Sequence, residues 1–156
     1  VVEEFAIENF AWNPAKADWS NREERKFTRR VEWLTDYGAE KGPPRKATAA
    51  KLVRLGDGKY LAVWEQHTLA GRGWQYDQTW AMTFTVEGPV GNKQVKKGKP
   101  AALKNLRLHR GDDAVPLAVG GKSVAGWVSA GATYTQLLLH TLDADLKYKA
   151  YPLQAP

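Results

Sequence analysis

The chain has 156 residues, a length that suits one domain or part of a larger one. Its composition, 43% hydrophobic and 26% charged, is that of a globular protein and excludes wholesale disorder. The formal net charge of +6 allows an acidic partner without identifying one, and the absence of cysteine excludes disulfides, cysteine-based zinc sites and a thiol nucleophile.

No apolar run reaches the ~18–20 residues that a membrane helix needs, so no membrane span is expected. The first residues, Val1 to Glu4, have neither the basic start nor the apolar stretch of a signal peptide. Because the chain begins with Val1 and not with Met, two explanations stay open. One is processing from a longer precursor, and the other is numbering that starts away from the natural beginning.

The middle of the chain predicts a β-hairpin followed by a third strand. Residues 51–55 and 59–65 are short apolar runs on either side of Gly56-Asp57-Gly58, and Asp-Gly pairs favour turn positions with positive φ. Residues 79–86 alternate between apolar and polar side chains, as a half-buried strand requires. One face of this strand would carry Trp80, Met82, Phe84 and Val86.

The same pattern recurs nearer the C-terminus. Residues 116–119 and 123–129 surround a Gly120-Gly121 turn, and residues 135–142 form the third run. The Asp143-Ala144-Asp145 segment closes this second unit. The sequence therefore predicts two related three-stranded modules.

The two modules place their tryptophans alike. Trp64 and Trp127 occupy the same position in the two hairpins, 63 residues apart. We expect the modules to differ in the loop between their second and third strands, which would be long at residues 66–78 and short at residues 130–133. Repeats with one variable loop are typical of stacked supersecondary units.

A further, outer strand is expected before each hairpin, at residues 31–36 and at residues 105–109. The first segment also fits a helix, because residues 20–23 match a capping box and Phe27, Val31 and Leu34 follow at helical spacing. The repeat favours the strand over the helix, since tertiary pairing often overrides local propensity.

Residues 52–65 resemble the first two strands of a blade in bacterial β-propeller proteins. In those repeats a Gly/Asp turn precedes an apolar strand that ends in Trp-Glu, as Trp64-Glu65 does here. The second module departs from the pattern, with Val128 after its tryptophan. The resemblance covers roughly residues 30–150 and implies a fold type, together with a secreted or periplasmic location.

The expected fold is therefore all-β, a propeller fragment of about two to two and a half four-stranded blades. Residues 1–29 would be an extension or the end of a preceding blade, residues 30–91 the first unit and residues 92–156 the second. Propellers close with about 4–8 blades, so a companion chain or further copies of this one would complete the ring. The alternative is a self-contained β-sandwich or barrel.

The segment from Gly71 to Trp80 holds the candidate ligand-binding residues. Aromatic faces beside hydrogen-bonding groups stack on sugars, bases or cations, and loops on rigid scaffolds often bind ligands. The alternative is that these rings fill the gap between blades or dock a partner chain. The candidates are Arg72, Trp74, Tyr76, Asp77 and Trp80.

Catalytic and metal signals are weak. Glu65 and His67 are the candidate acid/base pair, and a carboxylate next to an imidazole is common by chance. The scattered histidines lack metal-ligand spacing, and we expect His140 to face outward from its strand. We expect no cofactor or metal. Two basic clusters favour solvated surfaces over a nucleic-acid interface, the first with Arg22, Arg25, Lys26, Arg29 and Arg30 and the second with Lys93, Lys96, Lys97 and Lys99.

The sequence favours a non-catalytic recognition or scaffold part of a larger secreted β-propeller assembly, processed from a longer precursor. One alternative is a subunit of a propeller enzyme whose active site is completed by a partner chain. The other is a carbohydrate-binding lectin that uses the loop from Trp74 to Trp80.

Overall fold

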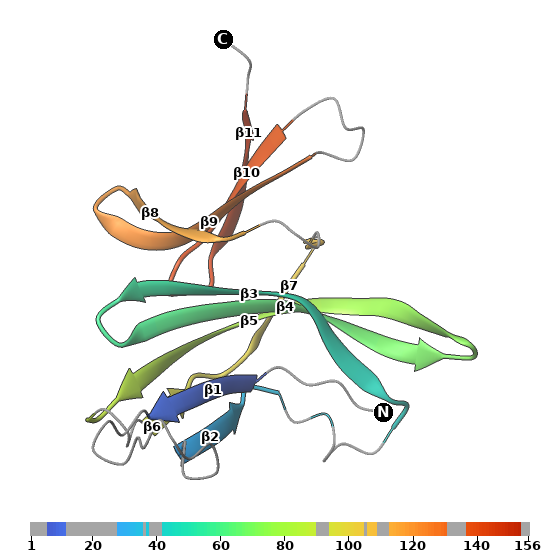
Figure 1. Ribbon diagram of the computed structural model, residues 1–156. Helices are drawn as coiled ribbons and strands as arrows, with labels where there is room; N and C mark the ends of the chain where they lie inside the picture. The colour runs from blue at the N-terminus through green and yellow to red at the C-terminus, as the bar shows by residue number, and fades with distance from the viewer. Residues whose placement is uncertain are drawn as a thin grey trace, which may run out of the picture.

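The computed structural model is all-β, with eleven strands and no helix among the residues it describes (Figure 1). It describes residues 6–11, 28–35, 37, 42–89, 94–104, 106–108, 113–130 and 137–153. The strands form three antiparallel sheets, and none of these sheets closes on itself.

The first sheet has the order β3-β4-β5-β6, with β7 also paired to β5. Its predicted hairpin is confirmed: β3 and β4 are antiparallel around Asp57 and Gly58, and Gly58 has the positive φ of 67° that such a turn needs. The strands are β3 (Arg45–Gly56), β4 (Lys59–Ala70), β5 (Gly73–Glu87), β6 (Gln94–Lys97) and β7 (Ala101–Leu103).

The predicted long loop at residues 66–78 is wrong. β4 continues to Ala70, and β5 begins at Gly73, so one long hairpin replaces the loop. Gly71 supplies a positive φ of 60° at its two-residue turn. The segment looks like a loop in sequence because its side chains are polar, yet its backbone groups pair across the hairpin as in any other strand.

The second sheet has the order β11-β10-β9-β8, and its predicted hairpin and third strand are confirmed. Gly120 and Gly121 both have positive φ, 57° and 76°, as the tight turn between β8 and β9 requires. The strands are β8 (Val115–Val119), β9 (Lys122–Ala130), β10 (Leu137–Leu142) and β11 (Tyr148–Leu153).

The predicted outer strands are misplaced. Residues 31–33 do belong to a strand, β2 (Thr28–Trp33), but it pairs with β1 (Ala6–Ala11) in a separate sheet. Residues 106–108 are not in a strand. In both larger sheets the outer strand follows the third strand instead. The helix alternative is wrong for residues 28–33, and its capping box lies outside the described residues.

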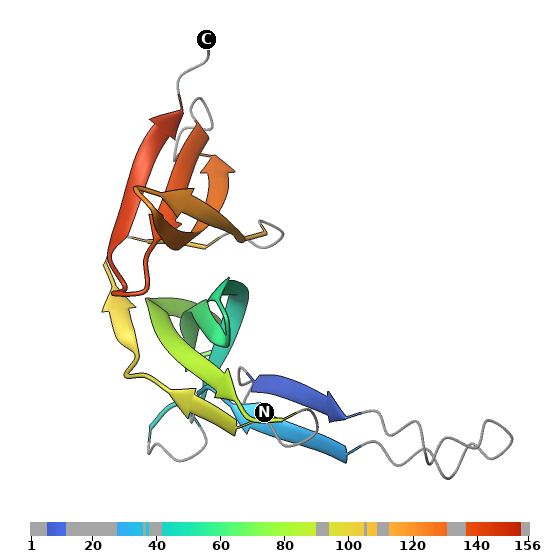
Figure 2. The same ribbon diagram turned by 90° about the vertical axis from the view of Figure 1, so that its left-hand side faces the viewer.

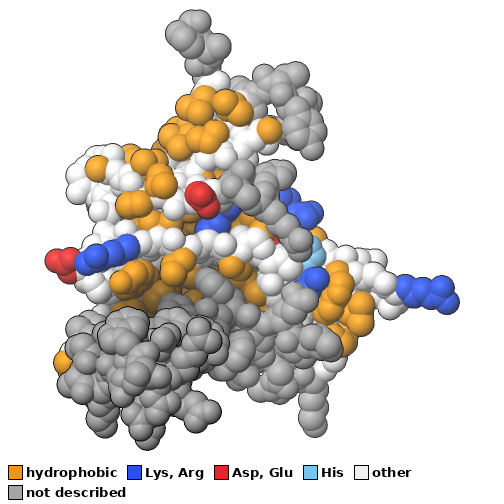
Figure 3. All heavy atoms as spheres, viewed as in Figure 1, with side chains coloured by type: hydrophobic (Ala, Val, Ile, Leu, Met, Phe, Trp, Pro, Cys, Tyr) orange, Lys and Arg blue, Asp and Glu red, His pale blue; other side chains and the backbone are white. Residues whose placement is uncertain are grey.

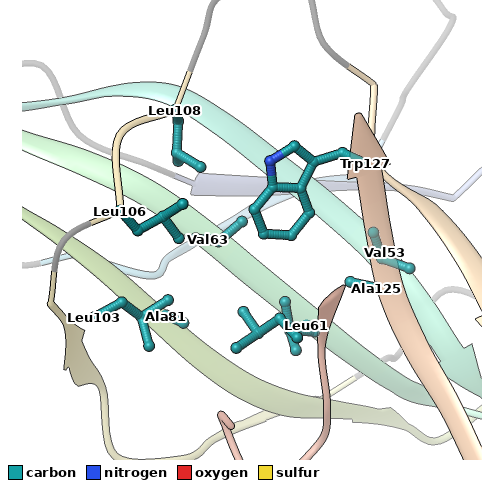
Figure 4. Close-up of a cluster of buried hydrophobic side chains, with 10 residues drawn as sticks. Val53, Leu61, Val63, Ala81, Leu103, Leu106, Leu108, Ala125 and Trp127 are labelled. Carbon is teal, nitrogen blue, oxygen red and sulfur yellow. The ribbon is translucent and has the colours of Figure 1, made fainter. Parts of the chain in front are cut away.

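The second sheet contacts the first through β8 and β9, while β10 and β11 extend away from it, and β1 and β2 lie on the opposite side of the first sheet (Figures 1 and 2). A buried apolar cluster fills the space between the two larger sheets. The Trp127 ring lies among side chains of the first sheet and of the segment between β7 and β8, here called the connecting segment, which contributes Leu106 and Leu108 (Figure 4). The members of the cluster are Val53, Leu61, Val63, Ala81, Leu103, Leu106, Leu108, Ala125, Trp127 and Leu142.

The tryptophans of the two larger sheets lie on corresponding faces. Trp64 belongs to a second cluster on the far side of the first sheet, where it packs with Leu34 after β2. Trp127 points toward the first sheet. Each tryptophan therefore lies on the face of its sheet that contacts the preceding part of the chain.

Replacing Trp127 by Ala should lower the free energy of unfolding by about 3–5 kcal/mol, because the ring is only 2% exposed and its loss leaves a cavity between the sheets. Urea unfolding measures the change. Leu52→Ala is the control: Leu52 is 45% exposed, and its truncation should cost about 0.5 kcal/mol or less. Equal effects of the two substitutions would contradict this packing.

Candidate functional site

Glu65 on β4 fastens the segment that connects the two sheets. Its side chain is buried, and its Oε1 accepts hydrogen bonds from the Leu108 backbone N–H at 2.8 Å and from Arg107 Nε at 2.9 Å. Its Oε2 lies 2.9 Å from His67 Nε2. Both carboxylate oxygens therefore have hydrogen-bond partners. This arrangement suits a residue that holds the connecting segment in place better than it suits a general base.

Two opposing effects set the charge of the Glu65 carboxylate. Burial raises its pKa, while the hydrogen bonds with His67, the Leu108 backbone and Arg107 lower it. The net result is a pKa below the usual value, so the carboxylate is charged at neutral pH. A general acid or base needs a pKa close to the working pH, and Glu65 is shifted away from it.

Three side chains of β5 hold the end of β7 and the connecting segment that follows it. The Tyr76 hydroxyl and the Thr79 hydroxyl both donate to the Leu106 carbonyl, at 3.0 and 2.5 Å. Gln78 Nε2 donates to the Leu103 carbonyl at 2.9 Å. These bonds satisfy buried backbone groups and fix the path along which Leu106 enters the apolar cluster.

A β-bulge separates the predicted ligand-binding residues. Gln66 pairs with Gln78 but His67 pairs with Tyr76, so Asp77 is the extra residue. A bulge re-aims the side chains beyond it. Tyr76 consequently lies with Glu65 on the side of the second sheet, while Trp80 packs on the opposite side beside the Trp64 cluster.

The five predicted ligand-binding residues therefore do not form one site. Arg72 is exposed at the hairpin turn, and Asp77 accepts hydrogen bonds from Gln66 at 2.5 Å and from Thr68 at 3.4 Å. Trp80 is partly buried, and its buried indole N–H has no hydrogen-bond partner among the described residues. Trp74 and Tyr76 are the two rings that share the hairpin face bearing His67.

Cations cover both of these rings. Lys46 Nζ lies 4.6 Å from the ring centre of Trp74, and the Arg107 guanidinium carbon lies 3.8 Å from that of Tyr76. A cation on an aromatic face occupies the surface that a sugar would stack on. A pocket of about 360 Å³ remains beside Tyr76, and Asp77, Gln78, Lys104, Leu106 and Arg107 also line it.

His140 is buried, so the prediction that it faces outward is wrong. Its Nε2 lies 2.6 Å from Ser129 Oγ, and its Nδ1 lies 2.8 Å from the Tyr148 hydroxyl. The ring also stacks between Trp127 and Tyr148, at centroid distances of 5.3 and 5.9 Å. Burial raises the pKa of the Tyr148 phenol. The alternation of side chains along β10 does not show which face of the sheet His140 occupies. Its pairing with Trp127 does, because Trp127 points toward the first sheet.

No group of three or more potential metal ligands occurs within the described ranges. The Asp143 carboxylate caps a turn by accepting from the backbone N–H groups of Asp145 and Lys147, both at 2.9 Å. Lys96 of the second lysine cluster bonds to Glu87 at 2.7 Å. His109 and the first basic cluster, apart from the backbone of residues 29 and 30, lie outside the described residues.

The face of the second sheet turned away from the first, here called the outer face, is apolar and open. Six of the seven large hydrophobic residues that are exposed in the described part of the chain lie on it, each 40–53% exposed. Apolar side chains are visible over this sheet in Figure 3. The six residues are Val115, Val119, Val128, Leu137, Tyr151 and Leu153.

Comparisons with known proteins assign no relative. No family model, curated protein or solved structure matches the chain. Across the described residues, no helix has the length and apolar character needed to cross a membrane.

Glu65→Gln should lower the free energy of unfolding at pH 7 by about 1–3 kcal/mol, because the amide weakens two bonds to a buried charge. The folded-state pKa of Glu65 lies below its unfolded value, so this stabilisation exists above about pH 4.5 and disappears as the pH falls through the folded-state pKa. Urea unfolding at pH 7 and pH 3 measures the gap between the two proteins. A difference in unfolding free energy that does not narrow in acid would contradict the proposed role of the Glu65 carboxylate. Glu87→Gln, at an exposed position, is the control and should have a smaller effect.

Trp80→Ala should lower the free energy of unfolding by about 3 kcal/mol, while Trp74→Ala should change it by about 1 kcal/mol or less. Trp80 packs against a buried cluster, whereas Trp74 lies near the hairpin tip under Lys46. Chemical denaturation of the two variants measures the difference. Equal costs would contradict the packing of Trp80 against the buried cluster.

Proposed function

We propose that this chain is a non-catalytic recognition or scaffold part of a larger β-sheet assembly of the propeller type, in a secreted or periplasmic protein. The observation that carries the proposal is the open outer face of the second sheet. Exposed apolar residues gathered on one face of a sheet are typical of interaction sites, whereas single ones scattered over a surface are ordinary.

The contact between the two sheets supports the same role. Val63 and Leu61 lie on the face of the first sheet that the second sheet and the segment before it cover, and both are fully buried. On the corresponding face of the second sheet, Val124 is 6% exposed and Val128 is 42% exposed. The chain thus contains one covered face and one face of the same kind that is covered only in part.

The two other functions receive less support. The lectin would depend on the pocket beside Tyr76, because Trp74, Tyr76 and Trp80 do not form a common surface. The enzyme would depend on Glu65 and His67, and that carboxylate is occupied by the connecting segment.

If the outer face is an interaction surface, the isolated chain should bind the neutral dye Nile red and associate at high concentration. Val128→Lys places a charge in the centre of the face and should reduce both effects several-fold without unfolding the protein, since the position is exposed. Dye fluorescence and light scattering measure them.

Leu52→Lys is the matched control, because Leu52 is equally exposed but lies on β3, away from the outer face. It should leave dye binding unchanged. A chain that stays monomeric at high concentration and binds the dye no better than Val128→Lys would refute the proposed function.

A further inference from the structure

The pocket beside Tyr76 has charged groups of both signs in its wall. Its volume of about 360 Å³ is at the small end of the ~300–1,000 Å³ that ligand sites occupy. Part of β5 forms one side of the wall and the connecting segment forms the other, and the charged members are Asp77, Lys104 and Arg107. These residues lie outside the four strands of the second sheet, so a ligand here would be separate from the outer face.

Arg107 is held in position without any ligand. Its Nε donates to Oε1 of the buried Glu65 at 2.9 Å, and its guanidinium carbon lies 3.8 Å from the ring centre of Tyr76. The Arg107 side chain is nevertheless 58% exposed, and neither of its Nη nitrogens has a hydrogen-bond partner among the described residues. A guanidinium fixed in this way keeps donors for a carboxylate, which it binds in a forked geometry, and it loses little freedom on binding.

Lys104 and Asp77 add one charge of each sign that no ion pair neutralises. Lys104 is exposed and has no hydrogen bond or ion pair with the described part of the chain. The Asp77 carboxylate accepts from Gln66 and Thr68 through Oδ2 alone, so Oδ1 remains available as an acceptor within the described ranges. The bulge separates Asp77 from Tyr76, and the acceptor and the cations therefore stand at different parts of the wall.

The charges around the pocket favour a ligand that carries both signs. Glu65 already offsets the charge of Arg107, and His67 is bonded to the second oxygen of the same carboxylate. The remaining pair, Lys104 and Asp77, is balanced as well. A ligand with a carboxylate alone would bring a third negative charge near Asp77 and Glu65, whereas an added ammonium group gives Asp77 a partner.

We infer that this pocket binds a small amino carboxylate, whose carboxylate meets Arg107 and Lys104 and whose ammonium group meets Oδ1 of Asp77. Hydrogen bonds between charged groups are stronger than those between neutral groups, so a ligand that lacks either group leaves one charge of the site unanswered. The inference goes beyond the proposed function and does not depend on it.

Glycine, β-alanine and 4-aminobutyrate are suitable probes, because they differ only in the distance between their ammonium and carboxylate groups. At least one of them should bind the parent protein saturably in the millimolar range or below. Its N-acetyl and amide derivatives, which each lack one charge, should bind about tenfold more weakly. Shifts of the backbone amide NMR signals of Gln78 and Lys104 measure the dissociation constants.

Variants at the two ends of the pocket should separate the two charges. Asp77→Asn keeps an oxygen that can accept from Gln66 and Thr68, and it should weaken the best probe about tenfold while sparing its N-acetyl derivative. Lys104→Gln should weaken the probe and its N-acetyl derivative several-fold and spare the amide. Arg72→Gln is the matched control, since Arg72 is an exposed cation at the turn of the same hairpin and does not line the pocket.

The direction of the Asp77→Asn effect distinguishes an amino carboxylate from a simple anion. A ligand held through its carboxylate alone would bind this variant more tightly than the parent, because a repelling charge has been removed. That result would overturn the inference, and so would the absence of saturable millimolar binding by all three probes. Neither result bears on the proposed function, which the dye binding of the outer face decides.

Discussion

The burial of one indole ring determines how the two large sheets of this protein are joined. Trp127 extends from the second sheet into the cluster that contains Val63, Leu61 and the connecting residues Leu106 and Leu108. An aromatic ring of this size is among the largest apolar surfaces a chain can remove from water. The position of that ring fixes which face of each sheet is inside and which is left for other contacts.

The polar contacts around the cluster make the same arrangement specific. Burying the Glu65 carboxylate is costly unless it is paired, and it is paired with the backbone and side chain of the connecting segment. Tyr76, Thr79 and Gln78 fasten the neighbouring carbonyls. Glu65, a catalytic candidate in the sequence, therefore helps to join the two sheets. The outer face remains an exposed apolar surface.

The sequence predicted those parts of the fold that depend on local chemistry. The Asp57-Gly58 and Gly120-Gly121 turns, the third strands and the matching positions of Trp64 and Trp127 all follow from turn preferences and alternation. The long β4–β5 hairpin was missed because its paired strands are polar. The bulge at Asp77 and the burial of His140 depend on cross-strand register, which no local pattern encodes. The outer strand β11 contains Pro152, which conceals it as a strand in sequence.

The absence of cysteine allows a direct test of the covered and uncovered faces. Single cysteines at Val63 and at Val128 can be titrated with a thiol reagent under native conditions. Val63 is fully buried between the sheets and Val128 is 42% exposed, so the thiol at 128 should react rapidly and the thiol at 63 only after unfolding in urea. Equal reaction rates at the two positions in the native protein would contradict the burial of Val63 between the two sheets.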